Sequence, residues 1–399
     1  MVKVASGISA PSLGAVAHTL WLLVACGGHS VKPGSPAEGG AGGQPGTPPA
    51  GECSLSQGTF SGPLVYSGPP PPALAPVPDG LLTAWSDYRD VDFGLYAQAL
   101  DVQGKAAASE QRLFSSGPLE PELSLSLSSA GLALAWSDQE RLHVSLLDHD
   151  GTLRAADVWL SEPAQYTRAP RLAAAGERWG LVWQDGPRLT AATSRFALVG
   201  ASGGASDPLI LAPESANARQ PQLCFNGQRF GVVWHDQRSG KVEVWFRIVD
   251  AKGKAVTTDR RLAALEGQEA SLASIACERE NFAIAWNERL GSDEYLVRLQ
   301  RVDAQGNAFG DVLSWPGIFG ALAFNGRELQ LLRYTSFGAS ELWLERLSGG
   351  ALVEQRLAKE FSGTELQLPL VAQPERSVMI WSEEQQLMTA SFECPESSR

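Results

Sequence analysis

The chain has 399 residues with a formal net charge of −12, and it contains 41 Gly, 25 Pro and 12 Trp. The acidic balance argues against nucleic acid as a partner, because phosphates require a basic face. It also argues against electrostatic adhesion to anionic lipid. Frequent Gly and Pro together with large Trp rings favour many short strands joined by turns, an organisation found in single all-β domains of this size.

Residues 1–26 have the features of a targeting segment. Lys3 supplies a weak positive charge, and residues 13–25 form an apolar stretch that is too short to span a bilayer. The sequence Leu23-Val24-Ala25-Cys26 resembles the lipobox of bacterial lipoproteins. This resemblance implies that Cys26 becomes the acylated N-terminus of the mature protein, and Gly27 at the next position favours the outer membrane. An ordinary secretory signal that happens to contain a Cys is the alternative.

Residues 27–52 are rich in Gly and Pro and have almost no large apolar side chains. Such a segment cannot bury enough surface to offset the entropy lost on ordering. We therefore expect a disordered, flexible tether that holds the folded part of the chain away from the lipid surface.

Seven similar units follow, and each ends its second predicted strand at one anchor position: Trp85, Trp136, Trp183, Trp234, Trp286, Arg333 and Trp381. The anchors are 47 to 52 residues apart, and an apolar strand precedes each one. An acid stands two places after six of them: Asp87, Asp138, Asp185, Asp236, Glu288 and Glu383. An Arg follows within five places in five units: Arg89, Arg141, Arg188, Arg238 and Arg289. A repeat of this period is typical of stacked supersecondary units.

Unit four shows the strand pattern within a repeat, with predicted strands over residues 220–224, 230–234, 242–249 and 260–263. Consecutive residues of a strand point to opposite faces, and the second strand, from Phe230 to Trp234, has apolar residues on both. We therefore expect both of its faces to be buried. Four-stranded antiparallel sheets packed radially give every sheet two neighbours. The chain is therefore predicted to be an all-β protein with a seven-bladed β-propeller over residues 53–399. A linear solenoid is the alternative, but it would need polar caps.

The two ends of the folded region are predicted to share the last blade. The last unit supplies strands over residues 366–371, 377–381 and 387–392, and no fourth strand follows. Residues 56–64 resemble the fourth strand of unit one, so the N-terminal strand is expected to close the ring. Cys394 then ends the last third strand and Cys53 precedes its antiparallel neighbour, which predicts a Cys53–Cys394 disulfide.

The other two cysteines, Cys224 and Cys277, occupy nearly matching positions on the first strands of adjacent units. A second disulfide and a pair of buried thiols are both compatible with this placement. The even number of cysteines beyond Cys26 is typical of an oxidising compartment.

The pattern Trp-x-[Asp/Glu]-x-Arg, followed by a strand and a turn ending in Gly, resembles β-propeller repeats of bacterial secreted proteins and lipoproteins. It is also similar in outline to the propeller of the periplasmic Tol system. The clearest copy begins at Trp85-Ser86-Asp87-Tyr88-Arg89. The resemblance implies architecture more than activity. Unit six departs from it with Arg333-Tyr334, which predicts either a looser blade interface or an edge reshaped for a partner.

The repeated acids have two interpretations. A turn Asp can accept backbone N–H bonds and pair with Arg, which would brace each hairpin. Alternatively, the turns gather on one face around the axis as a polar ligand site, for which the candidates are Asp87, Arg89, Asp138, Asp185, Asp236, Arg238 and Glu288. A mainly acidic face of this kind would suit a cation, an amine or a sugar.

Signals for catalysis and metal binding are weak. The sequence has no G-x-S-x-G elbow, H-E-x-x-H motif or Cys/His ligand spacing, so we predict no catalytic residue, metal or cofactor. His235 is interpreted as a polar turn residue rather than a base. Asp148-His149-Asp150-Gly151 is interpreted as an Asp-Gly turn rather than a calcium loop, because the downstream acidic ligands are missing.

These features predict an exported lipoprotein, anchored to the bacterial envelope through lipid alone and monomeric. Its propeller would act as a non-catalytic binding or scaffold module for a protein or glycan. The alternative is a carbohydrate-active enzyme that uses carboxylates near the propeller axis, which would require two acids about 5–10 Å apart.

Overall fold

The computed structural model of the chain describes residues 52–59, 71–89, 92–117, 121–138, 141–159, 166–187, 191–262, 269–291, 294–336, 340–348, 351–361, 367–383 and 386–394. The predicted signal segment with Cys26, nearly all of the tether, and Arg188 lie outside these residues. Within the described part of the chain, no helix is long and apolar enough to cross a membrane.

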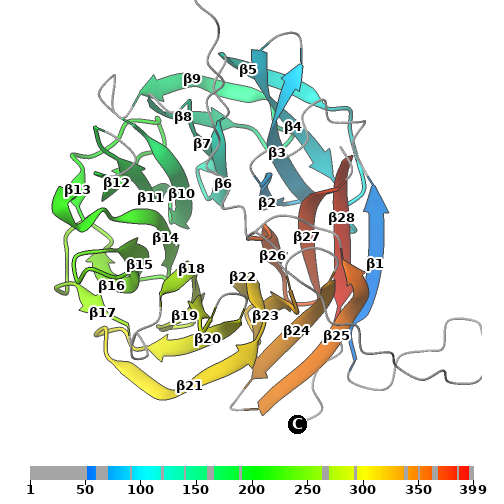
Figure 1. Cartoon of the computed structure of the whole chain (residues 1–399). Helices are drawn as coiled ribbons and strands as arrows, with labels where there is room; N and C mark the ends of the chain where they lie inside the picture. The colour runs from blue at the N-terminus through cyan, green and yellow to red at the C-terminus, as the bar shows by residue number, and fades with distance from the viewer. Residues whose placement is uncertain are drawn as a thin grey trace, which may run out of the picture. The chain divides into compact units, whose positions relative to one another are not determined.

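Seven four-stranded antiparallel sheets are arranged in a ring around a central axis (Figure 1), which confirms the predicted seven-bladed propeller. From the axis outward, blade one contains β2 (Ala73–Val77), β3 (Gly80–Arg89), β4 (Asp92–Leu100) and β5 (Gln111–Gly117). Blade two contains β6 (Glu122–Ser128), β7 (Gly131–Ser137), β8 (Leu142–Leu147) and β9 (Leu153–Trp159). Blade three contains β10 (Arg168–Ala175), β11 (Arg178–Asp185), β12 (Thr193–Val199) and β13 (Leu209–Ile210).

A short 3₁₀ helix, η1 (Glu214–Ala216), leads into blade four, which contains β14 (Arg219–Phe225), β15 (Arg229–Asp236), β16 (Glu243–Asp250) and β17 (Arg260–Arg261). Blade five contains β18 (Ala270–Glu278), β19 (Asn281–Arg289), β20 (Tyr295–Val302) and β21 (Ala308–Pro316). Blade six contains β22 (Ile318–Phe324), β23 (Leu329–Tyr334), β24 (Ser340–Ser348) and β25 (Ala351–Phe361). Blade seven contains β26 (Leu370–Ala372), β27 (Arg376–Glu383), β28 (Gln386–Glu393) and β1 (Ser54–Thr59).

The second strand of each blade is buried on both faces, as its sequence predicts. The anchors Trp85, Trp183 and Trp234 are each at most 1% exposed. Close packing between blades also requires small residues in these strands. A Cβ atom on Gly231 of β15 would lie 2.5 Å from the ring of Phe282 in the next blade. Glycine at this position therefore lets an aromatic ring of one blade lie directly against the backbone of its neighbour.

The N-terminal strand closes the ring. β1 pairs antiparallel with β28 from Ser54 opposite Glu393 to Thr59 opposite Met388, so it forms the fourth strand of blade seven. A Cys53–Cys394 disulfide joins the ends of these two strands. The predicted closure and disulfide are both confirmed, although the strand occupies residues 54–59 rather than beginning at residue 56.

A second disulfide links Cys224 on β14 to Cys277 on β18. These are the innermost strands of blades four and five, so the bond joins two adjacent blades near the axis. Of the two alternatives that the sequence left open, the structure therefore contains the disulfide rather than the buried thiols.

Several turns after the third strands share one backbone bond. In the turn at Asp250, the Asp side chain accepts the N–H groups of Lys252 and Lys254, and Gly253 adopts a φ of +82° that favours glycine. The predicted Asp-Gly turn at residues 148–151 has the same backbone bond, from the Gly151 N–H to the Asp148 carbonyl, at 3.0 Å.

In blade six, the Trp and Arg that face each other in blades three and five have exchanged strands. In those blades the anchor Trp lies opposite an Arg on the third strand, Trp183 opposite Arg195 and Trp286 opposite Arg298. In blade six Arg333 is the anchor and lies opposite Trp343. Arg333 is only 4% exposed and pairs with Glu345 at 2.7 Å. The anchor position is therefore filled by a buried ion pair, and the blade is not loosened there.

Candidate functional site

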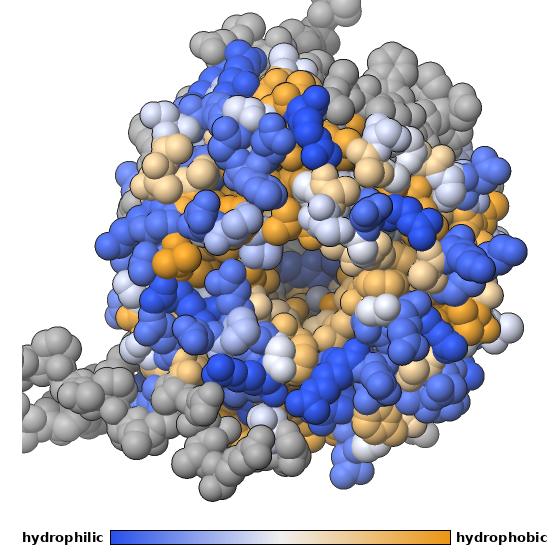
Figure 2. All heavy atoms as spheres, turned by 180° about the vertical axis from the view of Figure 1, so that it is seen from behind, coloured by the Kyte–Doolittle hydropathy of each residue, from blue (hydrophilic) through white to orange (hydrophobic). Residues whose placement is uncertain are grey.

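The ring is hollowed at its centre (Figure 2), and a cavity of about 210 Å³ lies among the innermost strands of the blades. Its lining comes from β2, β6, β10, β14, β18, β22 and β26, together with the residues that lead into β2 and β26. All seven blades therefore contribute to this axial pocket, at the end of the ring where the first strands begin.

One position of the repeat forms a layer around the pocket. Each member lies on a first strand, opposite the residue that precedes the anchor on the second strand: Ala73, Ser124, Arg171, Gln222, Ser274 and Ala321. The backbone positions are equivalent, but the side chains are not. Polar groups come from blades two to five, whereas blades one and six contribute alanine. The pocket thus breaks the symmetry of the repeat.

Backbone bulges precede four members of this layer, and Ala321 follows one of them. The pairing register shifts immediately before Arg171, Gln222 and Ser274. Before Arg171, Gln222 and Ser274, the residue two places earlier has a positive φ: Ala169 at 51°, Gln220 at 50° and Leu272 at 54°. A bulge bends its strand and redirects the side chains that follow. Left-handed backbone at non-glycine residues is strained, and such strain often marks functional sites.

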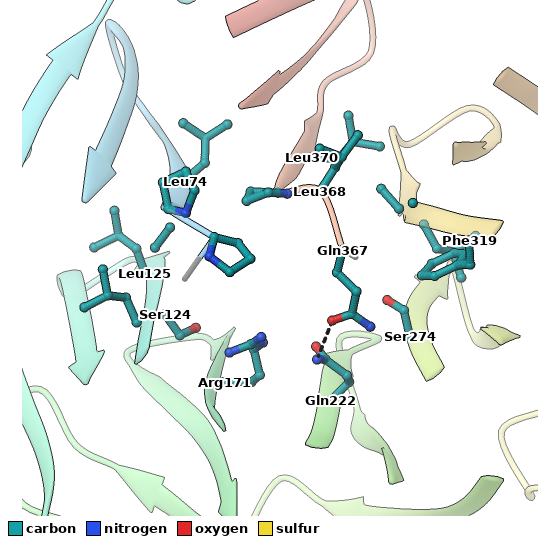
Figure 3. A pocket seen from close by; sticks show the side chains of 18 residues that line it. Leu74, Ser124, Leu125, Arg171, Gln222, Ser274, Phe319, Gln367, Leu368 and Leu370 are labelled. Atoms are coloured by element: carbon teal, nitrogen blue, oxygen red, sulfur yellow. Dashed lines mark hydrogen bonds between the residues drawn. The ribbon is translucent and has the colours of Figure 1, made fainter. Parts of the chain in front are cut away.

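Arg171 is the single charged residue in the pocket lining. Its side chain extends from β10 into the pocket between Ser124 and Gln222 (Figure 3). Nη1 donates a hydrogen bond to the carbonyl of Pro170 at 2.8 Å, and no carboxylate of a described residue forms an ion pair with this guanidinium. Burial lowers the pKa of Arg171, because the charged group is partly removed from water.

The nearby carboxylate of Glu122 is already engaged. Its Oε1 pairs with Arg168 at 3.0 Å, and its Oε2 accepts the Ala169 N–H at 2.6 Å. Glu122 opposes the lowering of the Arg171 pKa through its charge, but it does not hydrogen-bond that side chain. The guanidinium therefore keeps donors available to the pocket.

Amide and hydroxyl groups extend the polar half of the pocket. Gln222 Nε2 donates to Gln367 Oε1 at 3.4 Å, and Gln367 Nε2 donates to the Ala273 carbonyl at 3.3 Å. Ser274 lies beside them (Figure 3). Apolar residues from the other blades complete the lining, among them Leu74, Leu125, Leu368 and Leu370. No residue in this lining is Asp or Glu.

In blades three, four and five, the residue after the anchor bonds the first strand of the next blade. Gln184 Oε1 accepts the Gln220 N–H, and Asn287 Oδ1 accepts the Phe319 N–H at 2.9 Å. In both cases the acceptor lies on a second strand and the donor lies at the bulge of the next blade's first strand. These contacts satisfy N–H groups that the bulges remove from the sheet ladder. We call them inter-blade bridges.

His235 forms the equivalent bridge between blades four and five. It lies within β15 and is 6% exposed, so it is not the turn residue that the sequence predicted. Nε2 accepts the Ala273 N–H at 3.0 Å, and Nδ1 lies 3.1 Å from Gln220 Oε1. The ring must be neutral to accept at Nε2 and donate from Nδ1. Burial, and secondarily the charge of Arg219, lowers the pKa of His235 to about 4.

We expect this histidine to make stability depend on pH. Because its pKa is about 4 in the folded state and 6.5 when unperturbed, the unfolded chain binds more protons between these values. Stability should therefore fall as pH decreases from 6.5 to 4, by about 3 kcal/mol from this group alone. His235→Asn, which matches the bridge residue of blade five, should lack this component. Urea unfolding of both proteins at pH 7.5 and 4.5 measures the difference, and equal pH dependence would contradict the assignment.

The repeated acids lie within the blades and not in the axial pocket. Asp236 is fully buried, where its Oδ2 accepts hydrogen bonds from Trp234 Nε1 at 3.2 Å and from Arg238 Nε at 2.8 Å. Asp185 accepts from Trp183 Nε1 at 3.3 Å and from Arg195 Nε at 2.7 Å. The Trp-x-Asp pattern thus places an indole N–H and a carboxylate on one face of the strand, within hydrogen-bonding reach.

The remaining acids also have partners. Asp87 pairs with Arg89, and Glu288 pairs with Arg298 at 2.7 Å. Asp138 accepts the Arg141 N–H at 2.7 Å and lies 3.2 Å from His143 Nε2. In blades three and five an arginine of the third strand, Arg195 or Arg298, pairs with the acid. Arg188, which the sequence pattern suggested for blade three, lies outside the described residues. None of the seven predicted ligand-face residues lines the axial pocket, and their role in binding stays a prediction.

No group of three or more His, Cys, Asp or Glu side chains in the described residues is arranged to hold a metal ion. Residues 148–151, the fragment that resembles a calcium loop, use their acids locally. Asp150 Oδ1 accepts hydrogen bonds from the Thr152 N–H at 2.9 Å and from its hydroxyl at 2.7 Å.

Sequence reasoning missed both Arg171 and the inter-blade bridges. Two signals pointed to them. Pro170 and Pro221 stand directly before Arg171 and Gln222, and proline at a strand start often accompanies a bulge. A polar or hydroxyl-bearing residue also follows every anchor: Ser86, Ser137, Gln184, His235, Asn287, Tyr334 and Ser382.

No protein-family model and no curated protein sequence matches the chain. Several solved structures resemble it in fold. Polysaccharide lyase Uly1 aligns with a TM-score of 0.55 at 10% identity, over 83% of this chain and 92% of the lyase. A puromycin-hydrolyzing peptidase of Mycobacterium tuberculosis aligns with a TM-score of 0.51 at 14% identity, over 78% of this chain and 49% of the peptidase. A neuraminidase-like protein of the isolate A/flat-faced bat/Peru has a TM-score of 0.48 at 10% identity, covering 87% and 94%. Similarity at this level shows the propeller fold alone.

Proposed function

We propose that the protein is an exported, lipid-anchored component of the bacterial envelope whose propeller binds a protein or glycan without catalysing a reaction. The proposal that the propeller is not catalytic rests on one observation: the repeated acids are already paired within the blades. The carboxylates of Asp185, Asp236 and Glu288 are buried and paired with Arg. A glycosidase of the kind considered from the sequence would need two acids near the axis, and the lining of the axial pocket offers none.

Export is supported by the two disulfides, which persist in oxidising compartments. Attachment through Cys26 rests on the resemblance of residues 23–26 to a lipobox. Placement in the outer membrane rests on Gly27. Two or more acyl chains on Cys26 would give stable anchoring without a membrane-spanning helix.

The anchor is tested by acyl labelling in a Gram-negative host. The intact chain should incorporate an alkyne-tagged fatty acid and sediment with the outer membrane. Cys26→Ala should abolish the label, because the acylated sulfur is removed. A matched control, Cys224→Ala/Cys277→Ala, should keep it, because those cysteines form a disulfide within the ring. Labelling of the Cys26→Ala protein would overturn the proposed anchor.

Binding and catalysis are separated by two assays on the detergent-solubilised protein. Glycan and peptide arrays should give a saturable ligand, whereas polysaccharides incubated with the protein should show no release of reducing ends or unsaturated products. Turnover that survives purification to homogeneity would overturn the non-catalytic proposal. In that case, the surviving activity should be tested for loss on substitution of axial residues.

A further inference from the structure

We propose that the axial pocket is a binding site for a small monocarboxylate whose body is apolar, with Arg171 as the residue that recognises the carboxylate. This site goes beyond the proposed binding of a protein or glycan, and it does not depend on the lipid anchor. The juxtaposition that carries it is a guanidinium that no carboxylate of the described residues pairs with, on one side of a cavity whose opposite side is apolar.

The first step concerns charge. An arginine removed from water is costly unless an anion pairs with it, and several arginines of the blades have such partners. Arg238 pairs with Asp236 and Asp259, and Arg298 pairs with Glu288. Arg171 differs, because it hydrogen-bonds only the carbonyl of Pro170 among the described residues. An anionic ligand would supply the missing partner, and a carboxylate fits the planar fork of a guanidinium.

The second step concerns the groups beside the guanidinium. Ser124, Gln222 and Ser274 occupy the same layer of the repeat as Arg171. Ser124 and Gln222 lie in the two blades beside it, and Ser274 lies one blade further on. Figure 3 shows these side chains on the same half of the pocket as Arg171. Hydroxyl and amide donors at this spacing can satisfy carboxylate lone pairs that the arginine leaves free.

The third step concerns the ligand's body. Blades one, six and seven contribute small apolar residues to the lining, among them Pro72, Ala73, Ala321 and Pro369. Such a wall favours hydrocarbon over a polyhydroxylated ring, whose hydroxyls each need a polar partner. The cavity of about 210 Å³ limits size. An engineered apolar cavity of about 150 Å³ accepts benzene, so an aromatic or short branched monocarboxylate is of the right volume here.

The fourth step concerns preorganisation. Bulges with positive φ fix the backbone just before Arg171, Gln222 and Ser274. The inter-blade bridges from Gln184 and His235 then hold two of these bulges against the preceding blades. A polar site built on strained but bridged strands loses little freedom when the ligand binds, which increases its affinity.

The test uses the full-length, detergent-solubilised protein and benzoate as the probe, with binding measured by saturation-transfer NMR and calorimetry. Benzoate should bind, and benzamide, which has the same shape without the charge, should bind at least about tenfold more weakly. Arg171→Gln should weaken benzoate binding by a similar factor. Arg178→Gln, an exposed arginine of the same blade, should leave it unchanged.

A second readout distinguishes a binding role from a structural one. Because no carboxylate in the described part of the chain pairs with Arg171, Arg171→Gln should leave the Tm unchanged or raise it. A lower Tm would show that the arginine supports the fold and would overturn the proposal. Glucuronate and a tripeptide with a free C-terminal carboxylate serve as competing probes. Tighter binding of either than of benzoate would reject the apolar small molecule, and absence of binding by all three would reject the site.

Discussion

Replacing both Cys53 and Cys394 with serine is expected to lower the free energy of unfolding by about 2–5 kcal/mol. The disulfide spans 341 residues of sequence and joins β1 to β28, the two strands on which closure depends. Without it, the N-terminal strand is held to blade seven by backbone pairing. Thermal and urea unfolding under non-reducing conditions would measure the loss, and unchanged stability would show that the bond contributes nothing to closure.

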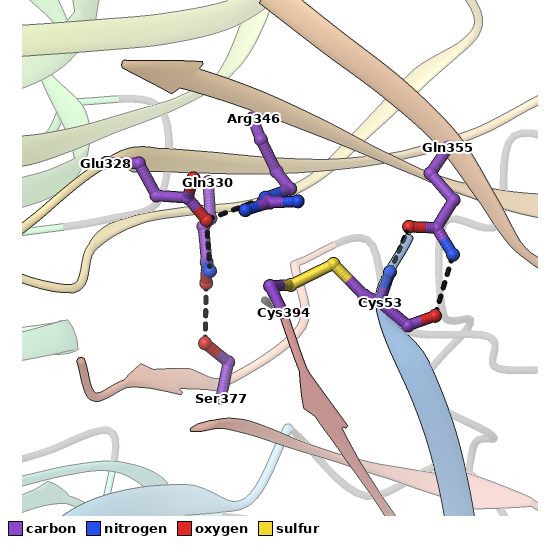
Figure 4. The surroundings of a disulfide bond; sticks show 7 residues. All are labelled: Cys53, Glu328, Gln330, Arg346, Gln355, Ser377 and Cys394. Atoms are coloured by element: carbon purple, nitrogen blue, oxygen red, sulfur yellow. Dashed lines mark hydrogen bonds and ion pairs between the residues drawn. A yellow bond between two sulfur atoms is a disulfide. The ribbon is translucent and has the colours of Figure 1, made fainter. Parts of the chain in front are cut away.

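The surroundings of this disulfide explain why its effect should be large. Gln355 of β25 clamps Cys53, because its Oε1 accepts the Cys53 N–H at 2.6 Å and its Nε2 donates to the Cys53 carbonyl at 2.8 Å (Figure 4). Blade six thereby fixes the start of β1. Ser377 of blade seven also donates to Gln330 of blade six. Loss of the disulfide therefore frees a strand that is in contact with two blades.

The second disulfide is the matched control for this experiment. Cys224 and Cys277 are 53 residues apart and join blades that are already adjacent. In the chain-entropy account, the shorter loop makes this bond less stabilising by about 1–2 kcal/mol. Cys224→Ser/Cys277→Ser should therefore cost less than Cys53→Ser/Cys394→Ser. The reverse order would mean that the bond between blades, and not the closure, limits unfolding.

Replacing Arg333 with methionine is expected to cost about 3–5 kcal/mol at neutral to alkaline pH. The substitution leaves Glu345, which is 0% exposed, without the guanidinium that pairs with it at 2.7 Å. Burial already raises the pKa of Glu345 to about 7, and Arg333 acts in the opposite direction. In the variant that opposing effect is lost, so the carboxyl should take up a proton more readily. The cost should therefore shrink when unfolding is measured at pH 5.

A double substitution separates the ion pair from the packing around it. Arg333→Met/Glu345→Gln removes both charges, so it should be less destabilising than Arg333→Met alone. Urea unfolding of the wild type, the two single variants and the double variant gives the coupling free energy. A double variant that is as unstable as the sum of the single variants would show that the pair does not interact. Packing of Arg333 over Trp343 would then account for the loss.

Much of the fold could be predicted because the residues that define the repeat are buried. Each anchor lies on a strand that is buried on both faces, so few residue types fit there. The anchors therefore recur at a regular spacing, and counting them predicts seven blades. Closure could be predicted from the ends of the chain, since Cys53 and Cys394 had to lie side by side if β1 completed blade seven. Unit six was harder. There the Arg is the anchor and the Trp lies opposite it on the third strand, as Arg333 and Trp343. The contact between Trp and Arg is kept, but the Trp anchor that marks the other units is lost.

The axial pocket could not be predicted, because what defines it is irregular. The first strands carry no constant residue, and no sequence pattern marks Arg171 as a residue that faces the axis. Spacing after Trp183 and Trp286 suggested Arg188 and Arg289 as partners of the acids. The third strand instead brings Arg195 and Arg298 across the sheet. Cross-strand contacts of this kind depend on register, which a linear pattern does not contain.

The most direct test of the central claim, a ring closed covalently between its two ends, is the cysteine connectivity of the protein isolated from its native source without reducing agent. Non-reducing proteolysis with thiols blocked, followed by mass spectrometry, should yield a peptide containing Cys53 joined to one containing Cys394. Cys224 should be joined to Cys277 in the same sample. Free thiols at Cys53 and Cys394, or a cross-link of either to another cysteine, would contradict the closed ring.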